Sequence, residues 1–134
     1  MPNEDTLQNA LRGVLTSIRK IAEEMHGSAI INRRGLPLAE DIGGENSKKL
    51  GAMIVAFLGT ARQISATVMG GEPISQSFFR TTEHTIYVYA ISADHVLAVL
   101  AGNQAPEGLI DWVIKDSEGE SVVATLRGLL GGAH

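Results

Sequence analysis

Two consecutive strand-like segments are apolar on both of their faces, and this feature constrains the fold more than any other. In residues 85–91 the alternating sets are Ile86, Val88 and Ala90 on one side, and Tyr87, Tyr89 and Ile91 on the other. In residues 95–101, one side carries Val96, Ala98 and Leu100, and the other side carries Leu97 and Val99. Because successive side chains of a strand point to opposite faces, a sheet built from these segments needs a cover on both sides. The pattern predicts three layers, with helices on both faces of a sheet.

The first part of the chain supplies a helix and a hairpin. Apolar residues at three- and four-residue steps predict an amphipathic helix over residues 7–22. Residues 28–32 and 36–41 then predict two strands joined by the turn Arg33-Arg34-Gly35, where Gly35 accommodates the positive φ of a tight turn. Pro37 has no N–H to donate to a neighbouring strand, so the second of these strands is expected at a sheet edge.

The strongest helical pattern covers residues 45–68. Its apolar stripe consists of Leu50, Met53, Ile54, Phe57, Leu58, Ala61, Ile64 and Val68. A second face carries small residues at helical steps, namely Ala52, Ala56, Gly59, Gln63 and Ala66. A helix of this kind is usually covered on both sides, so the pattern predicts burial of two faces. A glycine-rich break over residues 69–73 precedes a further strand, predicted over residues 74–80.

The C-terminal part is less regular. Residues 122–130 predict a short amphipathic helix, which Ser117 or Ser121 can cap. Residues 109–114 are apolar-rich, and the pattern leaves open whether they form a helical turn or an extended piece. A polar segment that begins at Asp116 separates residues 109–114 from the predicted helix over residues 122–130.

Composition narrows the class of protein. The chain has 134 residues, which suits a single domain over residues 1–134, with 44% hydrophobic and 19% charged residues. A formal net charge of -4 argues against nucleic acid as a partner. The absence of cysteine excludes disulfides, thiolate zinc sites and cysteine nucleophiles. The first residues are acidic and polar, unlike a signal peptide, and the longest apolar stretch, residues 51–61, is shorter than the roughly 20 residues of a bilayer span. A cytoplasmic protein is expected.

The residues with reactive or metal-binding side chains do not form a recognisable catalytic or metal site. His84 and His95 are expected at opposite ends of one hairpin, roughly 26 Å apart, which is too far to share a metal ion. No G-x-S-x-G elbow or phosphate-loop spacing is present. We therefore expect no catalytic residue, no metal and no cofactor. Arg33 and Arg34 are interpreted as a solvated hairpin tip, with contact to an acidic partner as the alternative. Trp112 is interpreted as a core or interface anchor, with a surface reserved for a partner as the functional alternative.

The order of helix, two strands, long helix, three strands and helix resembles the roadblock / dynein light-chain family over nearly the whole chain. The residues that carry the resemblance are the hairpin AIINRRGLPLA at residues 29–39, the glycine-rich break before ISQSFFR, and the strand pair TIYVYAI and VLAVLAG. The resemblance implies an α+β fold, similar to longin and profilin domains. Its five-stranded antiparallel sheet has the long second helix on one face and the terminal helices on the other. The interruption near Asp116 departs from the family's single closing helix.

The resemblance also implies that two subunits pair through their third strands, with the second helices side by side. The residues implied at this interface are Ala52, Ala56, Gly59, Gln63, Ala66, Ile74, Ser75, Gln76, Ser77, Phe78 and Phe79. Two features of the sequence agree with this pairing. The first is that residues 74–79 carry neither proline nor charge, because an unguarded strand edge usually has a partner. The second is the face of small residues on the long helix.

By the same resemblance, this chain is expected to be a non-enzymatic homodimeric scaffold or regulator that binds a small Ras-like GTPase. A small-molecule sensor of the same fold is the alternative, and it would be favoured if Tyr87 and Tyr89 faced a cavity. An enzyme is not expected, because no acid–base or nucleophile constellation is visible.

Overall fold

The computed structural model describes residues 4–20, 25–42, 44–105, 107–116 and 121–131. The helices are α1 (Glu4–Arg19), α2 (Gly44–Val68), α3 (Glu107–Asp111), the π-helix η1 (Trp112–Asp116) and α4 (Val122–Gly131). The strands are β1 (Met25–Asn32), β2 (Pro37–Glu40), β3 (Gln76–Arg80), β4 (His84–Ser92) and β5 (His95–Gly102). The last residues of the predicted first helix, 21 and 22, lie outside the described residues.

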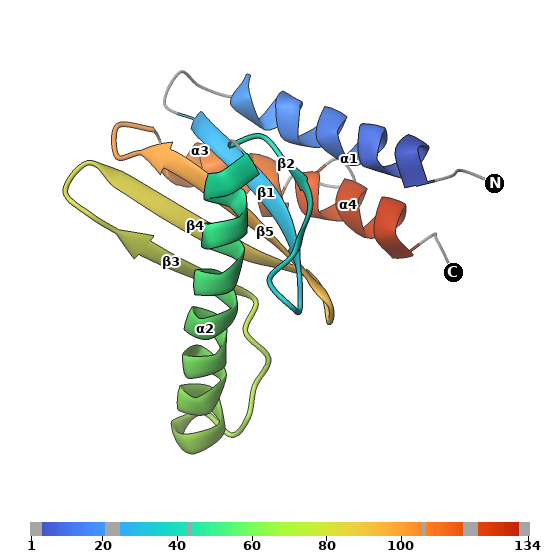
Figure 1. Ribbon diagram of the computed structural model, residues 1–134. Helices are drawn as coiled ribbons and strands as arrows, with labels where there is room; N and C mark the ends of the chain where they lie inside the picture. The colour runs from blue at the N-terminus through green and yellow to red at the C-terminus, as the bar shows by residue number, and fades with distance from the viewer. Residues whose placement is uncertain (1–3, 21–24, 43, 106, 117–120, 132–134) are drawn as a thin grey trace.

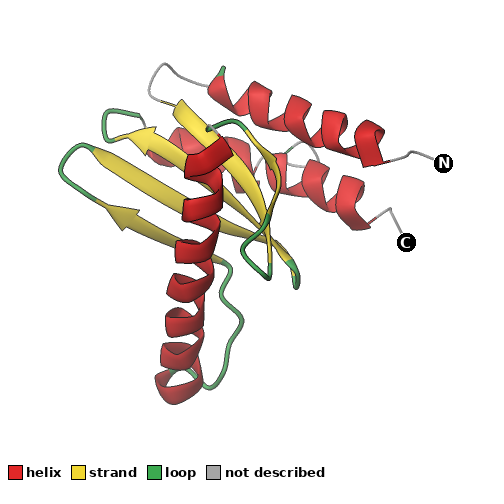
Figure 2. Ribbon diagram, in the orientation of Figure 1, coloured by secondary structure: helices red, strands yellow, loops and turns green. Residues whose placement is uncertain are grey.

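One five-stranded sheet forms the middle layer, and its strand order is β2-β1-β5-β4-β3 with every neighbouring pair antiparallel. Helix α2 crosses one face of the sheet, and α1, α3 and α4 lie on the other (Figures 1 and 2). The three-layer prediction is confirmed. Pro37 pairs with Ile31 in the edge strand β2, as its missing N–H requires.

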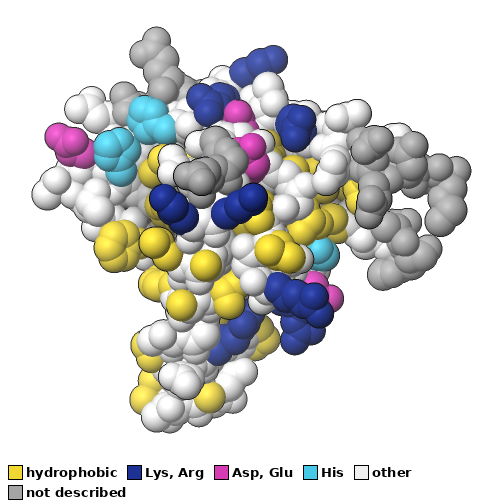
Figure 3. All heavy atoms as spheres, in the orientation of Figure 1, with side chains coloured by type: hydrophobic (Ala, Val, Ile, Leu, Met, Phe, Trp, Pro, Cys, Tyr) yellow, Lys and Arg dark blue, Asp and Glu magenta, His cyan; other side chains and the backbone are white. Residues whose placement is uncertain are grey.

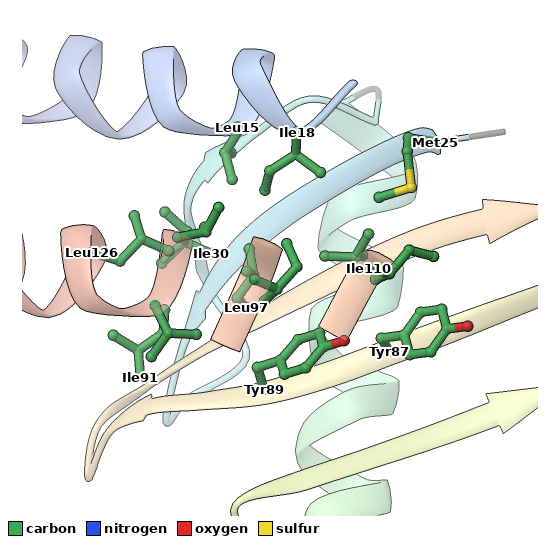
Figure 4. Packing of buried hydrophobic residues seen from close by; sticks show 14 of the residues in the cluster. Leu15, Ile18, Met25, Ile30, Tyr87, Tyr89, Ile91, Leu97, Ile110 and Leu126 are labelled. Atoms are coloured by element: carbon green, nitrogen blue, oxygen red, sulfur yellow. The ribbon is translucent and has the colours of Figure 1, made fainter. Parts of the chain in front are cut away.

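Two cores lie on opposite faces of the sheet, and the alternation along β4 and β5 assigns residues to them. The larger core, under α1, α3 and α4, includes Tyr87, Tyr89, Ile91, Leu97 and Val99 together with Leu15, Ile18, Ile110 and Leu126 (Figure 4). The smaller core, under α2, consists of Ala29, Ile31, Ile54, Leu58, Val88 and Ala98. Both sets follow the predicted period of two, so the sequence placed these side chains on the correct faces.

The first hairpin turns as predicted, with Gly35 at φ 86°. The Asn32 side chain closes the turn, because its Oδ1 accepts hydrogen bonds from the backbone N–H of Arg34 at 2.9 Å and of Leu36 at 3.0 Å. The turn also lies directly against α2, where a Cβ on Gly51 would overlap the carbonyl oxygen of Gly35. Glycine at both positions lets helix and hairpin approach backbone to backbone.

Helix α2 differs from its prediction, because it is buried along one narrow line rather than on two faces. Ile54 and Leu58 pack on the sheet, whereas other members of the predicted apolar stripe are exposed in the single chain. Their exposed fractions are 67% for Met53, 38% for Phe57, 52% for Ile64 and 70% for Val68. The lower half of α2 extends beyond the sheet, where the connection to β3 runs beside it (Figure 1) and the Ser65 hydroxyl donates to the carbonyl of Glu72 at 2.6 Å.

The length and composition of α2 also meet the criteria for a membrane-spanning helix. The segment Asn46–Val68 has a mean hydropathy of 1.2, and 22% of the window is buried within the structure. The sequence expectation considered only the uninterrupted apolar run and did not foresee this. Ile54 and Leu58 at the middle of the segment pack on the β-sheet. One such helix is weak evidence for a membrane span, because a core helix can meet the same criteria.

The open question about residues 109–114 resolves as helix. Residues 107–111 form α3, and the chain continues directly into the π-helix η1. Ile110 and Ile114, four residues apart, are both fully buried in the larger core. Helix α4 begins after Ser121, whose Oγ accepts a hydrogen bond from the N–H of Ala124 at 3.1 Å, as an N-cap does. The alternative cap, Ser117, lies outside the described residues.

Candidate interaction surface

Strand β3 has a free edge in the single chain. The N–H of Ala90 donates to the carbonyl of Ser75 at 3.0 Å, and the register continues with Ser77 opposite Val88. Because hydrogen-bonded and non-bonded pairs alternate in an antiparallel ladder, the backbone groups of Ser77 face β4. Those of Gln76 and Phe78 face away from β4. No described strand pairs with them, so this edge is ready to accept another strand.

Large apolar side chains are exposed on β3 and on α2. Phe78 is 54% exposed and Phe79 is 62% exposed, and they project from opposite faces of β3. Phe79 lies opposite Ile86 on the α2 side of the sheet, and with Met53, Phe57, Ile64 and Val68 of α2 it makes up what we call the β3–α2 surface. Figure 3 shows hydrophobic side chains over α2 and at the sheet edge beside it. Exposed apolar surface of this extent usually marks an interaction site.

The residues predicted at the interface lie around the same surface. Ala52, Ala56, Gln63, Ala66, Ser75, Phe78 and Phe79 are exposed, whereas Gly59, Ile74, Gln76 and Ser77 are half-buried. At 100° per residue, the small face of α2 is turned mostly away from the sheet, and Met53, Phe57 and Ile64 form a second exposed flank beside the buried line. The sequence prediction missed this second flank because it assigned these residues to the core. The signal for this flank was the width of the apolar arc, which is greater than a single line of contact with a sheet can cover.

The candidate partner-contact residues are all exposed. Arg33 forms an ion pair with Asp94, 3.2 Å between Nη1 and Oδ1, and the two side chains are 74% and 56% exposed. A pair this exposed contributes at most about 1 kcal/mol to stability. The hairpin tip is therefore solvated, and this weak ion pair connects it to Asp94. Arg34 is also exposed, and Trp112, 57% exposed on η1, is not a core anchor. The partner contacts of these three residues remain predictions.

A polar network connects η1 and α3 to the free edge. Asp111 Oδ1 accepts hydrogen bonds from the Tyr89 hydroxyl at 2.7 Å and from Gln76 Nε2 at 3.1 Å. Lys115 Nζ donates to Gln76 Oε1 at 3.1 Å. Tyr87 and Tyr89 themselves are buried among core side chains (Figure 4). The tyrosines therefore face packed residues rather than a cavity, which removes the reason first given for a sensor.

The Tyr89→Phe substitution is expected to lower the free energy of unfolding by about 1.5 kcal/mol, because it removes a hydrogen bond to a carboxylate. Urea denaturation measures the change. The same substitution made in an Asp111→Ala background should then cost less than about 0.5 kcal/mol, since its partner is already gone. An equal loss in both backgrounds would show that the hydroxyl is stabilised by something else.

The histidines do not form a metal cluster in the part of the chain that the structure describes, where no group of three or more His, Cys, Asp or Glu is placed to hold an ion. His84 and His95 lie at opposite ends of the β4–β5 pair, opposite Gly102 and Ser92 respectively. The sequence did not foresee that His26 approaches His84, with ring centroids 5.4 Å apart.

A hollow of about 780 Å³ opens beside the C-terminal half of α2. It is bounded by that helix, by residues 71–76 and by the adjoining ends of β4 and β5, and it lies within one chain. Residues from both hairpin turns, Arg33 and Ala93, reach its border. The hollow could not be predicted from the sequence, because its walls come from segments that are distant along the chain.

The layered sheet with one unguarded edge defines a class of small α+β interaction domains. The Roadblock/LC7 domain model matches residues 15–101, and the chain belongs to this family. Among solved structures, Myxococcus xanthus MglB is 15% identical with a TM-score of 0.83, covering 100% of this chain and 96% of its own. A Roadblock/LC7 domain from Streptomyces avermitilis is 14% identical with a TM-score of 0.80, over 90% and 97%. An MglB structure with a tetrameric arrangement is 16% identical with a TM-score of 0.78, over 96% and 93%. No curated protein matches the sequence. At such identities these neighbours establish the fold.

Proposed function

We propose that this chain forms a homodimer that binds and regulates a small Ras-like GTPase without catalysing a reaction of its own. The observation that carries the proposal is the free edge of β3 next to the exposed apolar flank of α2. The roadblock family includes proteins that bind or regulate such GTPases. The tetrameric arrangement of a similar MglB supports assembly between copies of this fold.

Pairing of β3 with the β3 of a second copy satisfies the outward-facing backbone groups of Gln76 and Phe78. A two-fold axis through this pair joins the two sheets into one and brings both α2 helices to the same face. The helices then lie side by side, where burial of Phe57 and Ile64 adds apolar contact to the strand pairing. The small residues of α2 lie on another side of the helix from Phe57 and Ile64, and their place at the interface stays a prediction from the sequence.

The GTPase is proposed to contact the dimer through exposed residues outside the strand pair. Arg33 and Arg34 at the hairpin tip, and Trp112 on η1, are the candidate contacts. Two arginines suit an acidic surface, and a tryptophan suits an apolar contact at the centre of an interface. The site of action is proposed to be the cytoplasm.

Affinity capture from the host lysate tests this function. The immobilised chain is incubated once with GDP and once with a non-hydrolysable GTP analogue, and bound proteins are identified by mass spectrometry. We expect a Ras-like GTPase in one nucleotide state at several-fold higher yield than in the other. A triple variant of Arg33, Arg34 and Trp112 to alanine serves as the control and should recover less. Failure to recover any GTPase in either state would contradict the proposal.

A second candidate function, that of a small-molecule sensor, is favoured by one observation only, the hollow beside α2. It does not exclude the first, because a ligand held next to α2 lies close to the proposed dimer surface.

A further inference from the structure

We propose that the hollow beside α2 binds a small organic anion, namely a carboxylate or phosphate group carried on an apolar body. Its volume of about 780 Å³ lies in the range of roughly 300–1,000 Å³ that is typical of small-molecule sites. The inference goes beyond the proposed function and does not depend on it.

The floor of the hollow is apolar. It is formed by Leu58 of α2, Ile74 before β3, Val88 and Ala90 of β4, and Val96 of β5. Side chains from four parts of the chain therefore supply non-polar contacts within the hollow. Such contacts favour a ligand with a hydrocarbon chain or an aromatic ring, because burial contributes about 25 cal/mol to the binding free energy for each Å² of apolar surface removed from water.

The border of the hollow carries arginines from three separate elements. They are Arg33 in the β1–β2 turn, Arg62 in α2 and Arg127 in α4. Arg62 makes no hydrogen bond or ion pair within the described residues, so its full guanidinium is available. The Nε of Arg127 donates to the carbonyl of Ile91 at 2.7 Å, which positions the side chain and leaves its terminal nitrogens to bind a ligand.

The carboxylates near the hollow do not cancel this charge. Glu72 is the one carboxylate among the described lining residues, and Asp94 pairs with Arg33 at the border. Three guanidinium groups thus face two carboxylates, in a chain whose overall formal charge is -4. A local excess of positive charge on an acidic protein indicates selection for an anion, and guanidinium binds carboxylate and phosphate oxygens in a bidentate manner.

The two properties together define the ligand class. An inorganic anion would leave the apolar floor unused, and an uncharged hydrocarbon would leave Arg62 unpaired. A molecule with an oxyanion at one end and an apolar body at the other uses both parts of the site. Carboxylate and phosphate oxygens share this chemistry, so both head groups are included in the test.

Nuclear magnetic resonance titration of the 15N-labelled wild-type chain tests the inference with four probes: octanoate, octyl phosphate, 1-octanol and inorganic phosphate. We expect saturable shifts of the Ala90, Ala93 and Val96 amides with octanoate or octyl phosphate. The tighter of the two identifies the head group. 1-Octanol and inorganic phosphate should bind at least tenfold more weakly, because each satisfies only half of the site.

The Arg62→Glu variant should weaken binding of the tighter amphiphile at least tenfold, and Arg62→Gln should have a smaller effect of the same sign. Arg12→Glu, which makes the same charge change at an exposed position on α1, should stay within twofold of wild type. Shifts that map instead to the exposed flank of α2 around Phe57 and Ile64 would overturn the inference. Equal binding by wild type and Arg62→Glu would do the same. Either result leaves the proposed GTPase function in place, since that function is tested by capture.

Discussion

Replacement of Phe78 by proline is expected to convert the dimer into a folded monomer. The backbone N–H of Phe78 faces away from β4, so proline removes a donor that only a second copy can use. The ring of proline also obstructs an approaching strand. We expect the dissociation constant to rise at least hundredfold, which corresponds to about 2.7 kcal/mol. Light scattering after gel filtration at micromolar concentration should show the mass fall from twice 14.2 kDa to 14.2 kDa.

Two further variants separate strand pairing from other effects. Phe78→Val keeps the N–H and a strand-favouring side chain, so it should remain dimeric. Ser77→Pro removes an N–H that faces β4, and it should disturb the β3–β4 pair within the chain, with a loss of circular dichroism signal. A dimeric Phe78→Pro variant would show that β3 is not the site of pairing.

Replacement of Gly51 by alanine is expected to reduce the free energy of unfolding by about 3 kcal/mol. The added Cβ would overlap the carbonyl oxygen of Gly35, and that oxygen belongs to a turn held by its own hydrogen bonds. Because backbone atoms stand on both sides, no side-chain rotation relieves the overlap and α2 must shift from the hairpin. Urea denaturation in the Phe78→Pro background measures the effect on a single chain.

The matched control is Gly59→Ala, in the same helix and the same background. A Cβ on Gly59 meets nothing within 4 Å, so the substitution should stabilise the chain by about 0.5–1 kcal/mol through helix propensity alone. Equal effects of the two substitutions would mean that α2 does not contact the hairpin turn as closely as described.

Most of the fold could be predicted from the sequence because its signals are local. The two-faced alternation of residues 85–91 and 95–101 required a sheet covered on both sides, and Gly35 and Pro37 located a turn and an edge. Each of these follows from the backbone geometry of one or two residues. Periodicity also grouped the apolar residues of α2 correctly, but it does not say how wide a contact the sheet offers. Met53 and Phe57 were therefore assigned to a core that covers only Ile54 and Leu58.

The parts that the sequence did not reveal depend on contacts between distant residues. Gln76 and Asp111 are 35 positions apart and meet only because β3 and α3 lie side by side. The three arginines around the hollow come from a turn and two helices on opposite faces of the sheet. The π-helix η1 was also missed, because an added residue within a turn leaves no periodic trace in so short a segment.

Hydrogen exchange at the amides of β3 tests the central claim most directly. The claim predicts that the outward-facing N–H groups of Gln76 and Phe78 are protected at high protein concentration and lose protection on dilution. The N–H of Ser77 should stay protected throughout, because it faces β4. Rapid exchange at Phe78 at every protein concentration would contradict pairing through β3.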